Sequence, residues 1–308
     1  MKKGRTIGTV NGIIAATSYG TNPLFALPLY MHGIGVNSVL FYRYSLAVLI
    51  YWFWLKFIKK ISLKLKKAEI LPMLILGLFF SLSSLTLFEA FKYIEAGIAC
   101  TILFIYPVLV ALMMTIFFKE KLTSIVVASI ALTSCGIGLL YNCKTGVTLD
   151  LQGIMLVLAS AFLYAFYIIG VKNNKTVKSI NSAKLSFYVM LFGLIVYIIN
   201  LKFCTELQIP DKPYLWLFTI GLAIFPTIIS LETITISIKL IGSTKTAVLG
   251  ALEPLTAIFF GILFFHETLT PRIVLGIILI LSGVILIITK KNRKLKTKGF
   301  KYDKMQLG

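Results

Sequence analysis

Four charged side chains stand inside long apolar stretches of this sequence: Arg43, Glu89, Glu232 and Glu253. A charge near the middle of a lipid-spanning helix costs about 2.5–3.5 kcal/mol or more unless it is paired or wet, so such residues mark functional sites. Glu253 is the deepest of the three acids. We expect it either to meet a substrate ammonium group or to carry a proton, and the alternative is a structural carboxyl bonded to a neighbouring helix.

Arg43 and Glu89 both fall in the predicted outer half of the membrane. One hypothesis is an ion pair that closes the outer side, another is that Arg43 holds a substrate carboxylate, and a static structural pair is the third. Glu232 lies nearer the predicted inner surface. It is a weaker candidate for binding or coupling, because water or Lys239 is within its reach.

Uncharged polar side chains at similar depth complete the candidate binding set. Tyr19, Tyr106 and Tyr164 are aromatic residues with a polar tip, which suits either a cavity wall or core packing. The amide of Asn22 can bond polar groups of a substrate.

Prolines interrupt several of the same apolar stretches, namely Pro23, Pro107, Pro226 and Pro254. A mid-helix proline removes a backbone donor and leaves the carbonyl four residues earlier without its helical partner. In lipid that carbonyl must find another partner or face a wet cavity. The four positions are therefore candidate hinge or binding points, with a simple packing kink as the alternative. The carbonyls released in this way belong to Tyr19, Leu103, Leu222 and Gly250.

The elements that must position these residues are membrane helices. The chain has 308 residues, of which 58% are hydrophobic and only 14% charged, and its mean hydropathy is +0.92. A soluble domain carries about 25% charged residues, and apolar runs of this length can span lipid only as helices. We predict an all-α membrane protein with ten transmembrane helices, at approximately 8–30, 35–57, 70–92, 96–118, 124–142, 150–171, 184–203, 213–238, 244–265 and 271–289.

The basic residues predict the orientation of these helices. With the N-terminus inside, 25 of the 31 Lys and Arg residues fall on the inner side and 5 on the outer side, while Arg43 lies within a helix. This asymmetry favours ten spans with both termini cytoplasmic, as in a bacterial inner membrane. It also explains the net charge of +20 without a nucleic-acid partner. The basic tail, residues 290–308, suits anionic lipid headgroups, and the alternative is a solvated, partly disordered tail.

The two halves of the sequence share a motif at a constant offset of 147 residues. The pairs are Pro107 and Pro254, Glu120 and Glu267, Leu122 and Leu269, Thr123 and Thr270, and Gly136 and Gly283. Such spacing indicates a duplication. Because each copy holds five helices, the second copy enters from the opposite face. We predict two inverted five-helix repeats, residues 1–142 and 143–289, an architecture typical of secondary transporters.

The repeated residues resemble the EamA-type branch of the drug/metabolite transporter superfamily. The resemblance rests on Glu89-Ala90-Phe91-Lys92-Tyr93, Pro107 and Glu120-Lys121-Leu122, on Leu252-Glu253-Pro254 through Glu267-Thr268-Leu269, and on Arg43. It implies a central cavity lined by helices 1, 3, 4, 6, 8 and 9, and small-metabolite substrates, often amino acids, that are exported. One departure from symmetry is that Tyr106 takes the place of Glu253 in the first half.

Further residues have a structural interpretation. Glu120 and Glu267 precede predicted helix starts, where an acid caps exposed amides. Gly136 and Gly283 suit close helix packing or a homodimer face. His32 and His266 lack the additional ligands of a zinc site. A disulfide between Cys143 and Cys204, both in predicted outer loops, is one open alternative.

No phosphate-binding loop, paired metal ligands or nucleophile motif occurs in the sequence, so we expect neither an enzyme nor a bound cofactor. The leading hypothesis is a secondary transporter that exports amino acids or related small polar metabolites by alternating access. The alternatives are an exporter of lipophilic cations, a transporter of nucleotide sugars, and a non-transporting assembly or sensor subunit.

Overall fold

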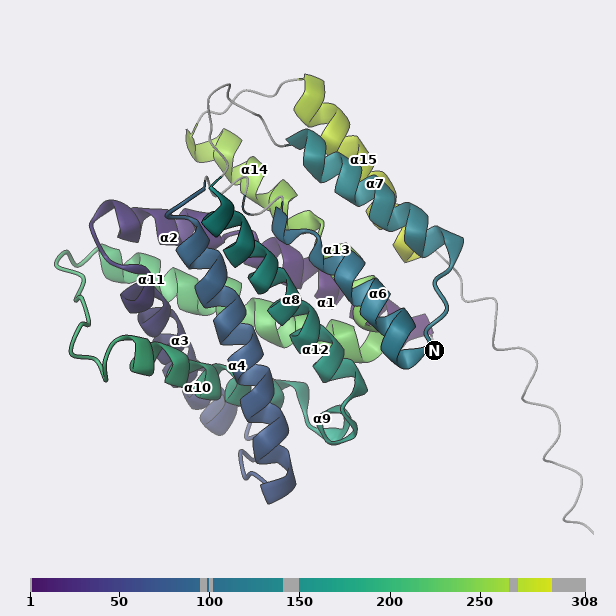
Figure 1. Ribbon diagram of the computed structural model, residues 1–308. Coiled ribbons are helices and arrows are strands. Elements are labelled where there is room, and N and C mark those ends of the chain that lie inside the picture. The colour runs from purple at the N-terminus through teal and green to yellow at the C-terminus, as the bar shows by residue number, and fades with distance from the viewer. Residues whose placement is uncertain (1, 95–98, 100–101, 141–149, 266–270, 290–308) are drawn as a thin grey trace, which may run out of the picture.

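The computed structural model describes residues 2–94, 99, 102–140, 150–265 and 271–289, and the regular elements in these ranges are helices, with no strand (Figure 1). The predicted all-α fold is confirmed. The first half contains α1 (Lys2–Tyr19), α2 (Asn22–Met31), α3 (Val36–Phe53), the π-helix η1 (Trp54–Ile58), α4 (Lys67–Ala90), α6 (Tyr106–Phe118) and α7 (Ser124–Leu140). The second half contains α8 (Leu151–Asn173), α9 (Lys175–Ser179), α10 (Ser182–Asn200), α11 (Leu215–Ala223), the π-helix η2 (Ile224–Ile229), α12 (Ser230–Ile241), α13 (Ser243–Leu249), α14 (Leu252–Phe265) and α15 (Pro271–Thr289).

Each predicted apolar segment overlaps at least one of these helices. The short helix α9 has no predicted counterpart, because five residues are too few to show a helical period. Within the described ranges, five helical stretches are long and apolar enough to cross a membrane: Val36–Ile58, Lys67–Ala90, Leu151–Asn173, Ser182–Asn200 and Leu215–Ile241. The total of ten spans stays a prediction.

Prolines determine where three of the remaining segments break. Pro23 and Pro107 lie in the first turns of α2 and α6, and Pro254 lies in the first turn of α14. The first turn tolerates proline because its N–H groups have no helical partner. The sequence interpretation placed these prolines inside kinked helices. The structure instead starts a new helix at each of them.

Pro226 behaves differently, because it lies inside a helix that continues through it. The backbone from Ile224 to Ile229 widens into the π-helix η2, which joins α11 to α12. Such π-bulges accommodate an irregular hydrogen-bond ladder and occur often at functional sites. The result is one long helix with a defect near its middle.

The two halves of the chain pack against each other throughout. Helix α1 lies along α12, α4 lies between α8 and α10, and α6 contacts α8 and α13 (Figure 1). The core therefore runs across the boundary between the predicted repeats, and neither repeat forms its core alone. A site built between them draws residues from both halves.

Helices α7 and α15 form one edge of the molecule and lie side by side in Figure 1. A Cβ atom on Gly136 would lie 2.7 Å from the carbonyl oxygen of Gly276, and one on Gly283 would lie 2.8 Å from that of Ser129. The glycines thus let the backbones of α7 and α15 touch within one chain. Such close packing matters in lipid, because no hydrophobic effect drives membrane helices together. This is the packing role that the sequence suggested. The homodimer stays a prediction.

Candidate substrate-binding site

Arg43 lies at the centre of the candidate site and is fully buried. Its Nε donates to Thr227 Oγ1 at 2.6 Å, and its Nη2 donates to the carbonyl oxygen of Pro226 at 3.1 Å. The third nitrogen, Nη1, has no hydrogen-bond partner among the described residues. Both N–H groups of Nη1 are therefore open, and a buried guanidinium with open N–H groups is suited to binding an anion, because charged hydrogen bonds are strong where water is excluded.

The π-helix η2 explains why Arg43 finds partners at this depth. Pro226 has no N–H group for the carbonyl of Leu222, and the hydroxyl of Thr227 donates to that carbonyl instead, at 2.7 Å. The same hydroxyl oxygen accepts the hydrogen bond from Arg43. The released carbonyl is therefore satisfied inside the protein, as a membrane interior demands, and the defect in the helix also anchors the arginine of α3.

Aromatic rings surround the guanidinium. The Arg43 Cζ atom lies 5.7 Å from the ring centre of Tyr19, 5.9 Å from that of Tyr44 and 5.6 Å from that of Phe88. Cation–π contacts at these distances stabilise a desolvated cation by about 2 kcal/mol or more. These ring contacts surround the charge without accepting a hydrogen bond from the open N–H groups of Nη1.

The three predicted tyrosines come together next to this cation. The ring of Tyr164, on α8, stacks on Tyr19 at a centroid distance of 6.5 Å and meets Tyr106 edge-on at 4.9 Å. The Tyr106 hydroxyl donates to the carbonyl oxygen of Ala247 at 3.1 Å. Gly250 makes room for that hydroxyl, since a Cβ atom there would lie 1.6 Å from it. Tyr19 and Tyr164 remain half-buried, whereas Tyr106 is buried.

Glu253 lies in the first turn of α14 and is half-buried. Its backbone N–H donates to the carbonyl of Gly250 at 2.9 Å, so the carbonyl released by Pro254 is also satisfied. The carboxyl group interacts electrostatically with Arg43, Tyr106 and Tyr164. One acid and one base thus face a shared aromatic environment, although the described residues show no ion pair between them.

Asn22 is the remaining polar group near the break between α1 and α2. It is 7% exposed, and neither the nitrogen nor the oxygen of its amide has a partner among the described residues. Helix α2 packs against α14, which carries Glu253. A buried amide without partners costs free energy, and a bound ligand would supply the missing bonds.

Two of the predicted site residues lie elsewhere. Glu89 forms an ion pair with Lys92 at 2.5 Å, and the described structure contains no ion pair between Glu89 and Arg43. The predicted Arg43–Glu89 ion pair was therefore wrong for this structure. Arg43 turns towards η2, and Glu89 turns towards the end of its own helix. Glu232 lines a separate cavity with Lys59 and Trp54, and Lys239 bonds to the carbonyl oxygen of Ile180 rather than to it.

Sequence reasoning missed Thr227, Tyr44 and Phe88. Thr227 had a usable signal, because it directly follows a proline inside an apolar segment and a threonine hydroxyl can replace the missing donor. No comparable pattern marks the two rings around Arg43. His266, Glu267 and Cys143 lie outside the described residues, while Glu120 is exposed at the junction of α6 and α7.

Discontinuous membrane helices around a central polar site are typical of secondary transporters. The EamA-like transporter family matches residues 6–142 and again residues 151–289, so the chain belongs to this family, a branch of the drug/metabolite transporter superfamily. It is an integral membrane protein and a membrane transporter.

Individual relatives agree with this assignment. The Bacillus subtilis (strain 168) protein called uncharacterized transporter YxxF is 26% identical over 236 residues, which cover 75% of this chain and 74% of that protein. An uncharacterized transporter of Archaeoglobus fulgidus is 34% identical over 71 residues, or 23% of this chain and 26% of that protein. A crystal structure of a protein with 15% sequence identity covers 92% of this chain and 98% of its own, with a TM-score of 0.77, and supports the fold.

Proposed function

We propose that this transporter exports small zwitterionic metabolites, amino acids or close relatives, by alternating access. The observation that supports the proposal most is the open Nη1 group of the fully buried Arg43, which lies within electrostatic reach of Glu253. An amino acid carries a carboxylate that can bind Arg43 and an ammonium group that can bind Glu253. The signs of the two protein charges therefore match the two ends of one small molecule.

Energetics favour a cargo that carries both charges. A desolvated ion is costly unless its counter-charge and hydrogen bonds are supplied. In our proposal the substrate carboxylate accepts from Arg43, and its ammonium meets Glu253 and the ring faces of Tyr19 and Tyr164. Asn22 supplies further polar contacts. A cargo with one charge would leave either Arg43 or Glu253 without compensation.

The breaks at Pro23, Pro107, Pro226 and Pro254 are the proposed hinges. Three of them separate helices that begin anew, and the fourth is the π-helix held by Arg43. A short break between rigid helices can absorb a change of backbone direction at little cost. Because the helices of the two predicted repeats pack on each other, movement at these points would open the site to alternate sides.

Membrane orientation and coupling belong to the same proposal. Both termini are proposed to lie in the cytoplasm of a bacterial cell, as the distribution of basic residues indicates. Glu253 is proposed to bind the coupling proton when no ammonium occupies the site. A single carboxyl group that binds either a proton or the cargo, and not both, would link their movements.

Two other cargo classes share part of this chemistry. A lipophilic cation would suit Glu253 and the tyrosines, but it would meet the charge of Arg43 without a carboxylate to neutralise it. A nucleotide sugar would suit Arg43, but its phosphates would face Glu253. The presence of both charges at one site favours the zwitterion over either of them.

The test is flux in proteoliposomes with a panel of radiolabelled amino acids, with and without a pH gradient. We expect the wild type to move at least one member of the panel and to respond to the gradient, and Glu253→Gln to lose the response. The matched control is Glu206→Gln, because Glu206 is an exposed acid paired with Lys202. If the wild type moved no amino acid but moved a cation or a nucleotide sugar, the proposal would fail.

A gradient response that survives in Glu253→Gln would remove this residue from coupling. The proposal that the protein transports amino acids would remain valid, but the coupling proton would have to bind at another group. Loss of transport in the Glu206→Gln control would mean that any removal of an acid impairs the protein, and the assignment to Glu253 would lose its support.

A further inference from the structure

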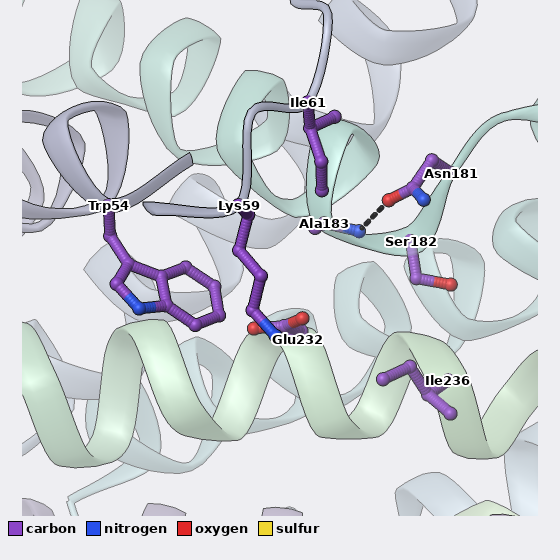
Figure 2. Close-up of a pocket in the computed structure, with 8 residues that line it drawn as sticks. All are labelled: Trp54, Lys59, Ile61, Asn181, Ser182, Ala183, Glu232 and Ile236. Atoms are coloured by element: carbon purple, nitrogen blue, oxygen red, sulfur yellow. Dashed lines mark hydrogen bonds between the residues drawn. The ribbon is translucent and has the colours of Figure 1, made fainter. Parts of the chain in front are cut away.

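A second cavity lies apart from the residues around Arg43. It has a volume of about 280 Å³ and is bordered by the end of η1, the start of α10 and the side of α12 (Figure 2). We call it the vestibule and define it by Trp54, Lys59, Asn181, Ser182 and Glu232, which are its polar and aromatic lining residues. Its size is below the roughly 300–1,000 Å³ of drug-sized sites, which favours a small ligand.

Two opposite charges face into the vestibule. Glu232 is half-buried on α12, and the side chain of Lys59 extends towards it from the chain that follows η1 (Figure 2). The two groups are not within ion-pair distance, since the ion pairs of the described residues involve other partners. Instead the Lys59 Nζ atom lies 4.9 Å from the ring centre of Trp54. Neither charge is therefore neutralised by an ion pair with the other, and a ligand that fits between them can meet both.

The start of α10 adds to the positive side of the vestibule. Asn181 caps this helix, and its Oδ1 accepts from the backbone N–H of Ala183 at 2.9 Å (Figure 2). A helix of this length presents the equivalent of about half a positive charge at its N-terminus. Lys59 and the helix end together favour a carboxylate, while Glu232 favours an ammonium group.

A seam of two helices connects the vestibule to the central site. Arg43 and Tyr51 lie eight residues apart on α3, or about 12 Å along the helix axis. Thr227 lies on η2, which packs on α3, and Glu232 lies on α12, which continues directly from η2. Tyr51 stacks on Trp54 at a centroid distance of 5.6 Å. It is 1% exposed, and its hydroxyl group interacts with the carboxyl group of Glu232. Tyr51 thus links the acid of the vestibule to the helix that carries Arg43.

We propose that the vestibule is a second binding site for the same zwitterionic cargo, with the ammonium at Glu232 and the carboxylate at Lys59. The inference rests on the proposed function and adds the place where cargo waits before it reaches Arg43 and Glu253. Lys59 and Asn181 both lie in segments that the charge distribution assigns to the cytoplasmic side, from which an exporter takes its cargo. Affinity is lower than at the centre, because water around the exposed Lys59 screens the charges.

The test is equilibrium binding of a radiolabelled mixture of the standard L-amino acids to the purified protein in lipid nanodiscs. The wild type should show two classes of site, with one molecule per chain in each. Glu232→Gln and Lys59→Gln should each remove the weaker class and leave the affinity of the tighter class unchanged. In export assays, the same substitutions should raise KM about tenfold and leave kcat at saturating cargo unchanged.

Lys56→Gln is the matched control. Lys56 is also exposed and also lies over a tryptophan, at 4.7 Å from a ring centre of Trp52, but neither residue lines the vestibule. It should keep both classes of site. Loss of the weaker class in this control would overturn the inference, because general surface charge would then explain the effect.

The outcomes separate the inference from the proposed function. A single class of site in the wild type, lost in Glu253→Gln and kept in Glu232→Gln, would overturn the vestibule and leave the central site standing. Two classes that both persist in Glu232→Gln would also overturn it. A wild type that binds no amino acid would overturn the proposed function and this inference with it.

Discussion

Arg43 uses two of its three guanidinium nitrogens to hold η2 and leaves Nη1 for a ligand. A lysine in its place would keep the charge but would lose the planar fork that makes this division possible. We expect Arg43→Lys to raise the KM of amino-acid export about tenfold to a hundredfold, because a hydrogen bond to a charged group contributes about 1.5–3 kcal/mol. The KM is obtained from initial rates of flux measured across a range of cargo concentrations.

The control for that substitution is Arg272→Lys, because Arg272 is exposed near the start of α15. It should leave both KM and kcat unchanged. A normal KM in Arg43→Lys would show that the positive charge alone is sufficient for binding, and that the open N–H groups of Nη1 play no part in it.

At the scale of elements, the continuous helix from α11 to α12 depends on the hydroxyl of Thr227. Thr227→Val keeps the shape of the side chain and removes the partner of both the Leu222 carbonyl and Arg43 Nε. We expect the free energy of unfolding to fall by about 1–3 kcal/mol, because two buried polar groups are left without partners. The readout is the melting temperature of the detergent-purified protein, followed by size-exclusion fluorescence.

Thr233→Val on the same long helix is the comparison. Its hydroxyl bonds only within the helix, to the carbonyls of Ile229 and Ser230. It should melt close to the wild type. Equal melting temperatures for the two variants would contradict the role of Thr227 as the link between η2 and α3.

The whole molecule is held together across its two halves, and the contact of α7 with α15 is one such place. Gly136→Leu puts a side chain where a Cβ atom already lies 2.7 Å from a backbone oxygen, so we expect the helices to separate and the melting temperature to fall. Gly138 lies on the same helix, and a Cβ atom there meets nothing within 4 Å. Gly138→Leu should therefore be tolerated in a monomer.

The same pair of variants tests the predicted homodimer. If the open side of α7 near Gly138 were a dimer face, Gly138→Leu would change the oligomeric state in a mass measurement in nanodiscs. An unchanged mass would exclude this face. Tolerance of Gly136→Leu would contradict the close helix contact.

Much of the fold was readable from the sequence, because lipid imposes simple rules on it. Apolar runs marked the helices, and prolines marked the breaks at Pro23, Pro107 and Pro254. Ion pairs within one helix could also be predicted from the sequence, because Glu89 and Lys92 are three residues apart and share a helix face. The sequence interpretation passed over this local pair in favour of Arg43.

The partners of Arg43 were not readable in the same way. Thr227 and Pro226 lie 184 and 183 residues away along the chain, and only the packing of α3 on η2 brings them together. The grouping of Tyr19, Tyr106 and Tyr164 beside Glu253 has the same origin. The sequence identified these residues individually, from their positions within apolar segments. Their positions relative to one another depend on how the two halves of the chain pack together.

The central claim is that one cargo molecule satisfies Arg43 and Glu253 together. Its most direct test is competition in proteoliposomes between a transported amino acid and two analogues of it, the amide without the carboxylate and the 2-hydroxy acid without the ammonium. We predict that the unlabelled amino acid competes fully, while each analogue competes at least about tenfold more weakly. If the amide competed as well as the amino acid, Arg43 would not bind the carboxylate and the zwitterion account would be contradicted.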